Sequence, residues 1–167
     1  PYPHHSKRAE PAGAPGATEI PVSRGGARTL RGAFRYGYYF HGADSLTVRL
    51  PAPTTKPIDS RAPGFMIQHA RSMPGQLLLI ALGPLTNVAR AIAREPRLTD
   101  WLSEIVVMGG AVEVPGNVTT AAEFNVYNDP AAAHAVFSSG VPVTLVGLDI
   151  CNKVAVGRRE AAWLSEG

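Results

Sequence analysis

Three continuous apolar runs organise the second half of the chain. They are QLLLIAL at 76–82, IVVM at 105–108 and VTLVGL at 143–148. Apolar runs of this length are typical of strands that are buried on both faces of a parallel sheet. We therefore predict a buried strand at each of the three positions.

Amphipathic helices are predicted between these runs. After the first run, apolar residues recur at helical spacing and mark one buried face (Leu85, Val88, Ala89 and Ile92). Pro96 ends this helix, and a further short helical turn follows (Leu98, Trp101 and Leu102). Before the third run, Asp129 suits an N-cap and Pro130 a first helical position. The buried face of that helix is predicted from Ala133, Val136 and Phe137, and Gly140 ends it.

The first half of the chain has a less regular pattern. Residues 19–23 predict a short strand, because Ile20 and Val22 alternate with polar or proline positions. Residues 24–57 are rich in glycine and proline and predict loops. A helix is predicted from Ser60 to the Pro74-Gly75 pair, on the helical spacing of its apolar residues.

The order strand–helix–strand predicts the fold class. We expect an α/β fold whose sheet is mostly parallel, with helices on both faces, open and Rossmann-like. In such sheets ligands bind beyond the carboxyl ends of the strands. The loops that follow the three runs, at 83–87, 109–117 and 149–152, therefore lie on the predicted ligand side.

Composition narrows the function classes. The chain has 167 residues, a net charge of only +3 and one cysteine. The weak charge does not indicate a polyanionic partner, and one cysteine excludes an intramolecular disulfide and a cysteine zinc site. No apolar run is long enough to span a membrane, and the first 22 residues contain no signal-peptide pattern, so we expect a cytoplasmic protein. Residues 1–18 are expected to be a disordered head and residues 19–167 a single domain.

Polar residues cluster in the stretch GNVTTAAEFNVYNDP at 116–130. In an extended segment Glu123 and Asn125 point to one side and Phe124 to the other. A carboxylate that accepts and carboxamides that donate and accept can together bind vicinal hydroxyls, and Asn117 adds a further carboxamide. The alternative is that Glu123 and Asn125 cap the following helix or hold the loop in place. The local pattern leaves both interpretations open.

Three segments together resemble the inosine–uridine nucleoside hydrolase family. They are LLLIALGPLTNVARAIAREPRL, EIVVMGGAVEVPGNVTTAAEFNVYNDPAAAHAVF and GVPVTLVGLDI. A weaker similarity covers IPVSRGGARTL and HGADSLTVRLP, where Ser-Leu-Thr stands in place of the family's usual Gly-Leu-Gly. The resemblance implies a fold of the nucleoside hydrolase type. It also implies hydrolysis of ribonucleosides to ribose and free base, with calcium as the cofactor and an aspartate as general base.

The resemblance assigns roles to particular residues. It implies ribose binding by Asn117, Glu123 and Asn125, and a site lined by Phe124 and Met108. It places the backbone carbonyl of Leu82 among the calcium ligands and His41 on the side of the base. With this context we favour the ribose-binding interpretation of Glu123 and Asn125 over the helix cap.

Two features of the family are absent from this sequence. None of the 13 acidic residues forms the family's DxDxxxDD-like run, and the family's C-terminal His-Asp pair is missing. We therefore expect an incomplete nucleoside hydrolase domain that holds calcium poorly and is inactive or nearly so by itself. The family's first strand is central to its sheet, so we also expect exposed apolar faces at 77–82 and 105–108, which favour self-association. The family's members are commonly oligomers.

Two alternatives come from other classes. The chain could be a non-catalytic remnant that binds ribose or a protein partner. The segment 23–40 could bind RNA through its arginines and tyrosines (Arg24, Arg28, Arg31, Arg35, Tyr36, Tyr38 and Tyr39). The modest net charge disfavours nucleic acid, and we favour a solvated basic loop.

Overall fold

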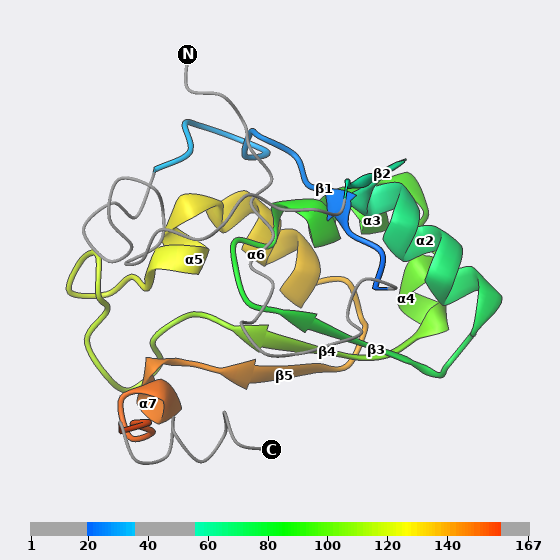
Figure 1. The fold of residues 1–167 in the computed structure, drawn as a ribbon. Helices are drawn as coiled ribbons and strands as arrows, with labels where there is room; N and C mark the ends of the chain where they lie inside the picture. Colours follow the sequence, from blue (N-terminus) through cyan, green and yellow to red (C-terminus); the bar gives the residue numbers. More distant parts are fainter. Residues whose placement is uncertain (1–19, 36–55, 158–167) are drawn as a thin grey trace.

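The computed structural model describes residues 20–35 and 56–157 and contains two parallel sheets (Figure 1). The larger sheet has the order β3-β4-β5, formed by Leu77–Ala81, Leu102–Met108 and Val143–Val146. The smaller sheet pairs β1 (Ser23–Arg24) with β2 (Ile58–Arg61). The three predicted strands are thus confirmed as parallel neighbours. The predicted disordered head at 1–18 lies outside the described residues.

Six helices accompany these strands in the described part of the chain. They are α2 (Ala62–Ser72), α3 (Thr86–Arg94), α4 (Leu98–Trp101), α5 (Phe124–Asn128), α6 (Pro130–Phe137) and α7 (Leu148–Cys151). Figure 1 shows α2, α3, α5 and α6 on one side of the larger sheet, with the arrowheads of β4 and β5 pointing toward α5 and α7. The core forms between the sheet and the helices on that side. Its most deeply buried side chains include Ile105 and Val107 of β4 and Val136 of α6.

Local signals correctly predicted two of the helices. Leu85, Val88 and Ala89 are buried along α3, as their spacing predicts. Asp129 is the N-cap of α6, where its Oδ1 accepts from the Ala132 N–H at 3.1 Å. Each helix is specified by residues within its own turn or two, which is why sequence alone was sufficient.

Four boundaries differ from the prediction. The N-terminal strand is Ser23–Arg24 and does not include residues 20–22 of the predicted strand. Ser60 belongs to β2, not to a helix, because β1 and β2 pair with each other. Leu102 belongs to β4 instead of the preceding helical turn. The last strand ends at Val146, since Leu148 begins α7.

Two burial predictions were also wrong. Phe137 ends α6 and is 42% exposed instead of facing the core. Strand β3 is not buried on both faces, because Leu78, Ile80 and Leu82 are 46%, 60% and 74% exposed. Leu77, Leu79 and Ala81 alternate with them and face the core. The apolar face expected to be exposed along 77–82 is therefore present on β3. The face expected along 105–108 is only partly exposed, at Val106 and Met108.

No helix among the described residues is both long and apolar enough to cross a membrane.

Candidate functional site

The predicted polar cluster lies at the carboxyl end of β4. Met108 ends this strand, Gly109 and Gly110 follow, and the loop returns to helix α5 through Glu123. Glu123 is buried, with 2% of its surface exposed. Its Oε2 accepts from the N–H groups of Gly110 (2.9 Å), Asn125 (2.9 Å) and Val126 (3.2 Å). One carboxylate oxygen therefore joins the strand end to the first turn of α5.

The two asparagines complete this connection. Asn125 donates through Nδ2 to the Met108 carbonyl at 3.0 Å, with the Met108 Sδ at 3.3 Å. Asn117 Oδ1 accepts from the Phe124 N–H at 2.9 Å. The structure thus brings together five of the predicted site residues, and they lie where parallel sheets bind ligands.

The backbone of this cluster differs from the extended segment that we predicted. Glu123 is the N-cap of α5 and Asn125 lies in its first turn, so the two side chains do not follow strand alternation. The helix-cap interpretation is confirmed for Glu123 as its local structural role. Within the described residues, no hydrogen bond reaches Glu123 Oε1, Asn125 Oδ1 or Asn117 Nδ2. Two acceptors and one donor therefore remain for a further partner.

The loop between Met108 and α5 depends on a close backbone approach at Gly116. A Cβ atom at this position would lie 2.2 Å from the carbonyl oxygen of Ala122. The Gly116 N–H donates to Thr120 O, and the Val118 N–H donates to Ala122 O. Glycine at 116 thus allows the turn that places Asn117 beside Phe124.

Asp149 holds the other side of the same loop. It lies in α7 and accepts from the N–H groups of Val112 (3.0 Å) and Glu113 (2.8 Å). These bonds, that of Val112 first, hold the pKa of Asp149 below its usual value of 3.8. The structure thus shows that Asp149 holds this loop by hydrogen bonds.

Acidification is expected to release this loop. Because the pKa of Asp149 is lowered in the folded chain, its contribution to stability is complete above the usual pKa and is lost as the pH falls through the lower, folded value. An NMR titration of the Val112 and Glu113 amides should therefore show a transition below pH 3.8. Asp149→Asn should remove the transition. A midpoint at or above the usual value in the wild-type chain would contradict this assignment.

Of the residues predicted to bind calcium and the base, the structure describes Leu82 but not His41. Leu82 follows β3 at the carboxyl edge of the sheet, while His41 lies outside the described residues. Among the residues that the structure describes, no group of three or more His, Cys, Asp or Glu side chains could hold a metal ion. Calcium takes six to eight oxygen ligands, so the described residues do not by themselves fit a calcium site.

Sequence reasoning missed the full role of Asn128 and Asp129. Both are buried, at 4% and 0% exposure, and both bind backbone amides far away in sequence. The Asn-Asp pair before Pro130 was visible as a helix start, but no local signal indicated the distant partners.

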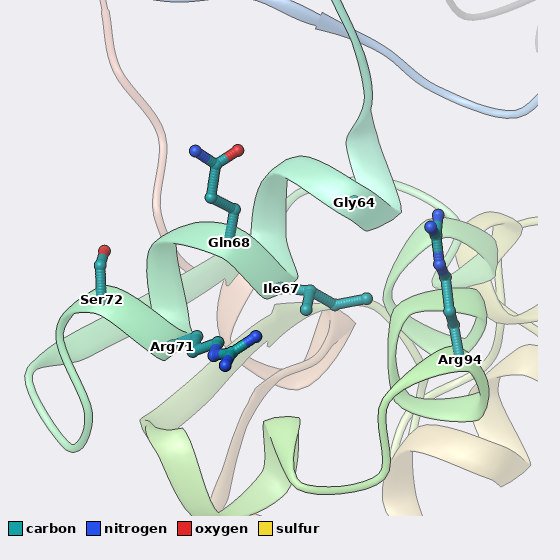
Figure 2. Close-up of a pocket in the computed structure, with 6 residues that line it drawn as sticks. All are labelled: Gly64, Ile67, Gln68, Arg71, Ser72 and Arg94. Carbon is teal, nitrogen blue, oxygen red and sulfur yellow. The ribbon is translucent and has the colours of Figure 1, made fainter.

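A hollow with a volume of about 480 Å³ lies between α2 and α3, away from the polar cluster. Figure 2 shows the residues that line it: Gly64, Ile67, Gln68, Arg71, Ser72 and Arg94. Ser72 ends α2 before β3 begins, and Arg94 ends α3 before β4 begins. The hollow therefore extends toward the amino ends of the strands, and it contains none of the predicted site residues.

The basic segment considered for RNA binding makes one of its arginine contacts within the chain. The guanidinium of Arg35 lies 5.0 Å from the centre of the Tyr127 ring. Arg24 and Arg31 are exposed, as a solvated basic loop would have them. Tyr36, Tyr38 and Tyr39 lie outside the described residues.

Comparison with known proteins points to one family. The sequence model of the inosine-uridine preferring nucleoside hydrolase family matches residues 10–166 of this chain. A probable uridine nucleosidase 1 of Oryza sativa subsp. japonica is 46% identical over 141 residues, which are 83% of this chain and 44% of that protein. Uridine nucleosidase 1 of Arabidopsis thaliana is 40% identical, over 83% of this chain and 42% of that protein.

Solved structures agree with this assignment. The plant nucleoside hydrolase PpNRh1 has a TM-score of 0.77 and 41% identity, covering 81% of this chain and 43% of its own. The purine-preferring ribonucleoside hydrolase from Gardnerella vaginalis has a TM-score of 0.81 and 31% identity. The match covers 89% of this chain and 48% of that protein. The chain spans less than half the length of these relatives. Because the family model matches nearly all of its residues, the chain belongs to the inosine–uridine preferring nucleoside hydrolase family.

Proposed function

We propose that this chain forms the ribose-binding part of a nucleoside hydrolase, which cleaves the N-glycosidic bond of a ribonucleoside to give ribose and a free base. The observation that carries the proposal is the buried Glu123 carboxylate. Three backbone N–H groups bind one of its oxygens, and its other oxygen has no hydrogen-bond partner among the described residues. A buried polar atom without a partner is costly, which supports a ligand that supplies one.

The remaining groups suit the vicinal hydroxyls of ribose. Each hydroxyl both donates and accepts, so it needs an acceptor and a donor on the protein. Glu123 Oε1 and Asn125 Oδ1 accept, and Asn117 Nδ2 donates. Phe124 and Met108 border the same cluster and could pack against the sugar. Hydrolysis of a glycosidic bond develops positive charge on the sugar, and a nearby desolvated carboxylate stabilises that charge.

Calcium belongs to the proposal as the cofactor of the family. Bound there, it would polarise the sugar hydroxyls and a water molecule. The described residues offer it the Leu82 carbonyl and no carboxylate cluster, so we expect this chain alone to bind calcium weakly. His41 remains our candidate for the base side.

Uridine is the substrate to test first. Two of the relatives described above are named as uridine nucleosidases, and the pyrimidine-specific ribonucleoside hydrolase RihA of Escherichia coli is 39% identical over 83% of this chain. The proposal includes homo-oligomerisation and a cytoplasmic location, the latter consistent with a single free cysteine.

The purified chain is expected to bind uridine without releasing ribose. The cluster provides the hydrogen bonds for the sugar, whereas no described residue is placed as a general base beside a metal. Binding is measured from NMR shifts of the Phe124 and Asn125 amides, and turnover from a reducing-sugar assay with calcium present. Calcium-dependent release of ribose would overturn the expected inactivity. Absence of binding to uridine, inosine and ribose would overturn the proposed function.

Asn117→Asp tests whether the cluster makes the contact. It keeps the oxygen that accepts from Phe124 N and replaces the free amide donor with a charged acceptor, so uridine affinity should fall by about tenfold. Asn87→Asp is the matched control, because Asn87 Oδ1 likewise accepts a backbone N–H, that of Gly26, at 2.8 Å. Equal affinities for the two variants would contradict a ribose contact at Asn117.

The intact mass of the protein from its own source separates hydrolase from non-catalytic remnant. A mass near that of this chain, 17.7 kDa, would favour the remnant. A mass about twice as large would favour a working hydrolase, since the relatives are about that long.

A further inference from the structure

Two buried polar side chains lie side by side at the junction of α5 and α6. Asn128 is the last residue of α5, and Asp129 is the N-cap of α6. Asn128 Oδ1 accepts from the Arg35 N–H at 2.7 Å, and Asp129 Oδ2 accepts from the Leu30 N–H at 2.7 Å. The same short stretch, residues 26–35, is thus bound twice by this junction. We call residues 26–35 the strap segment.

Hydrogen bonds hold the strap segment in place more than burial does. Thr29 is its only buried residue, at 7% exposure. Helix α3 binds its first half, because Asn87 Oδ1 accepts from Gly26 N and Arg90 Nη2 donates to the Arg28 carbonyl, both at 2.8 Å. The junction binds its second half, and Arg35 adds the contact with the Tyr127 ring of α5. The segment therefore bridges α3 and α5.

Asp129 makes more bonds than a helix cap requires. Capping uses one oxygen, Oδ1, which accepts from Ala132 N. The other oxygen accepts both from Leu30 N and, at 2.6 Å, from the Thr86 hydroxyl at the start of α3. The junction, α3 and the strap segment therefore meet at one atom, Asp129 Oδ2. Short hydrogen bonds to a buried carboxylate are among the strong ones.

We propose that Asn128 and Asp129 are positioning residues that lock the strap segment against α5 and thereby fix the helix that carries Glu123 and Asn125. Helix α5 has only five residues, too few to be stable without such contacts. Its first end is held by the Glu123 cap and its last end by Asn128 and the Asp129 junction. The consequence for substrate affinity rests on the proposed function, whereas the effect on α5 does not.

Hydrogen exchange of Asp129→Asn tests this coupling. The asparagine amide has only one oxygen. In one orientation its NH₂ group faces the donors of Leu30 and Thr86, and in the other it faces the Ala132 N–H and the cap of α6 is lost. The Leu30 amide and the Asn125 and Val126 amides, which are bound to Glu123, should exchange about tenfold faster or more. The Ile105 amide in the central strand reports global opening. Exchange at Asn125 and Val126 that rises only as much as at Ile105 would overturn the proposal, because it would show a general loss of stability.

Milder variants keep the test decisive if Asp129→Asn does not fold. Thr86→Val removes the hydroxyl donor at nearly constant shape and should loosen the α5 amides, while Thr86→Ser should restore them. Asp100→Asn is the control for Asp129→Asn, because it makes the same change at an exposed position of α4. It should alter the exchange of neither the Leu30 amide nor the α5 amides. If uridine binds the wild type, Thr86→Val should weaken it by about threefold or more. A wild type that binds no uridine would refute the proposed function, while the exchange result would still decide the coupling.

Discussion

Replacing Glu123 by alanine is expected to release helix α5 and abolish nucleoside binding, whereas glutamine should keep the helix and lose most of the binding. Alanine leaves the N–H groups of Gly110, Asn125 and Val126 without their acceptor. Glu123 is 2% exposed, so water cannot simply take its place. At about 1 kcal/mol for each lost bond, the free energy of unfolding should fall by about 3 kcal/mol.

Glutamine separates the two roles of this side chain. Its amide oxygen can replace Oε2 as the cap, so the free energy of unfolding should fall by only about 1 kcal/mol. Its NH₂ group replaces the second oxygen and removes the negative charge, so uridine affinity should fall by about tenfold or more. Chemical denaturation and uridine titration measure the two effects.

The exposed residue Glu113 supplies matched controls. Glu113→Ala and Glu113→Gln make the same chemical changes in the neighbouring loop and should alter neither stability nor affinity by much. If Glu123→Gln bound uridine as tightly as the wild type, Glu123 would be a helix cap only. If it destabilised the chain as much as alanine does, the cap would require the carboxylate itself.

The parts of the fold that local patterns determine were predictable from sequence. Strands β3 and β4 are visible as apolar runs, and α3 is visible in its helical spacing. The start of α6 is visible in Asp129 and Pro130, because capping involves residues three apart. In each of these cases the residues that determine the element lie within it.

The features that sequence missed depend on distant partners. Ser60 forms a strand only because β2 pairs with β1 more than thirty residues earlier. Asp129 reaches Leu30 across 99 positions, and nothing near either residue indicates the contact. The cluster at Glu123 was found by resemblance and by residue type, but its helical geometry was not, since α5 is too short to show a period.

The chain is expected to self-associate through the exposed face of β3, and Ile80→Lys should largely prevent it. Strand β3 is an edge of its sheet in the described residues, and Leu78, Ile80 and Leu82 are exposed on one face. The strand contains no charge and no proline, the usual protections of an edge. Parallel sheets normally have both faces covered, so this face favours contact with another copy.

The expected size of the effect follows from burial of the isoleucine. Full burial of this side chain contributes about 1.5–3 kcal/mol, so a lysine in its place should raise the dissociation constant of self-association by at least about tenfold. Val112→Lys is the control, because it adds the same charge at an apolar residue outside the strands. Val112 is 72% exposed, similar to Ile80. Sedimentation velocity over a range of concentrations distinguishes the three proteins. A monomeric wild type would contradict self-association through β3. Equal effects of the two lysines would show that net charge or another surface governs association, and that the apolar stripe of β3 does not.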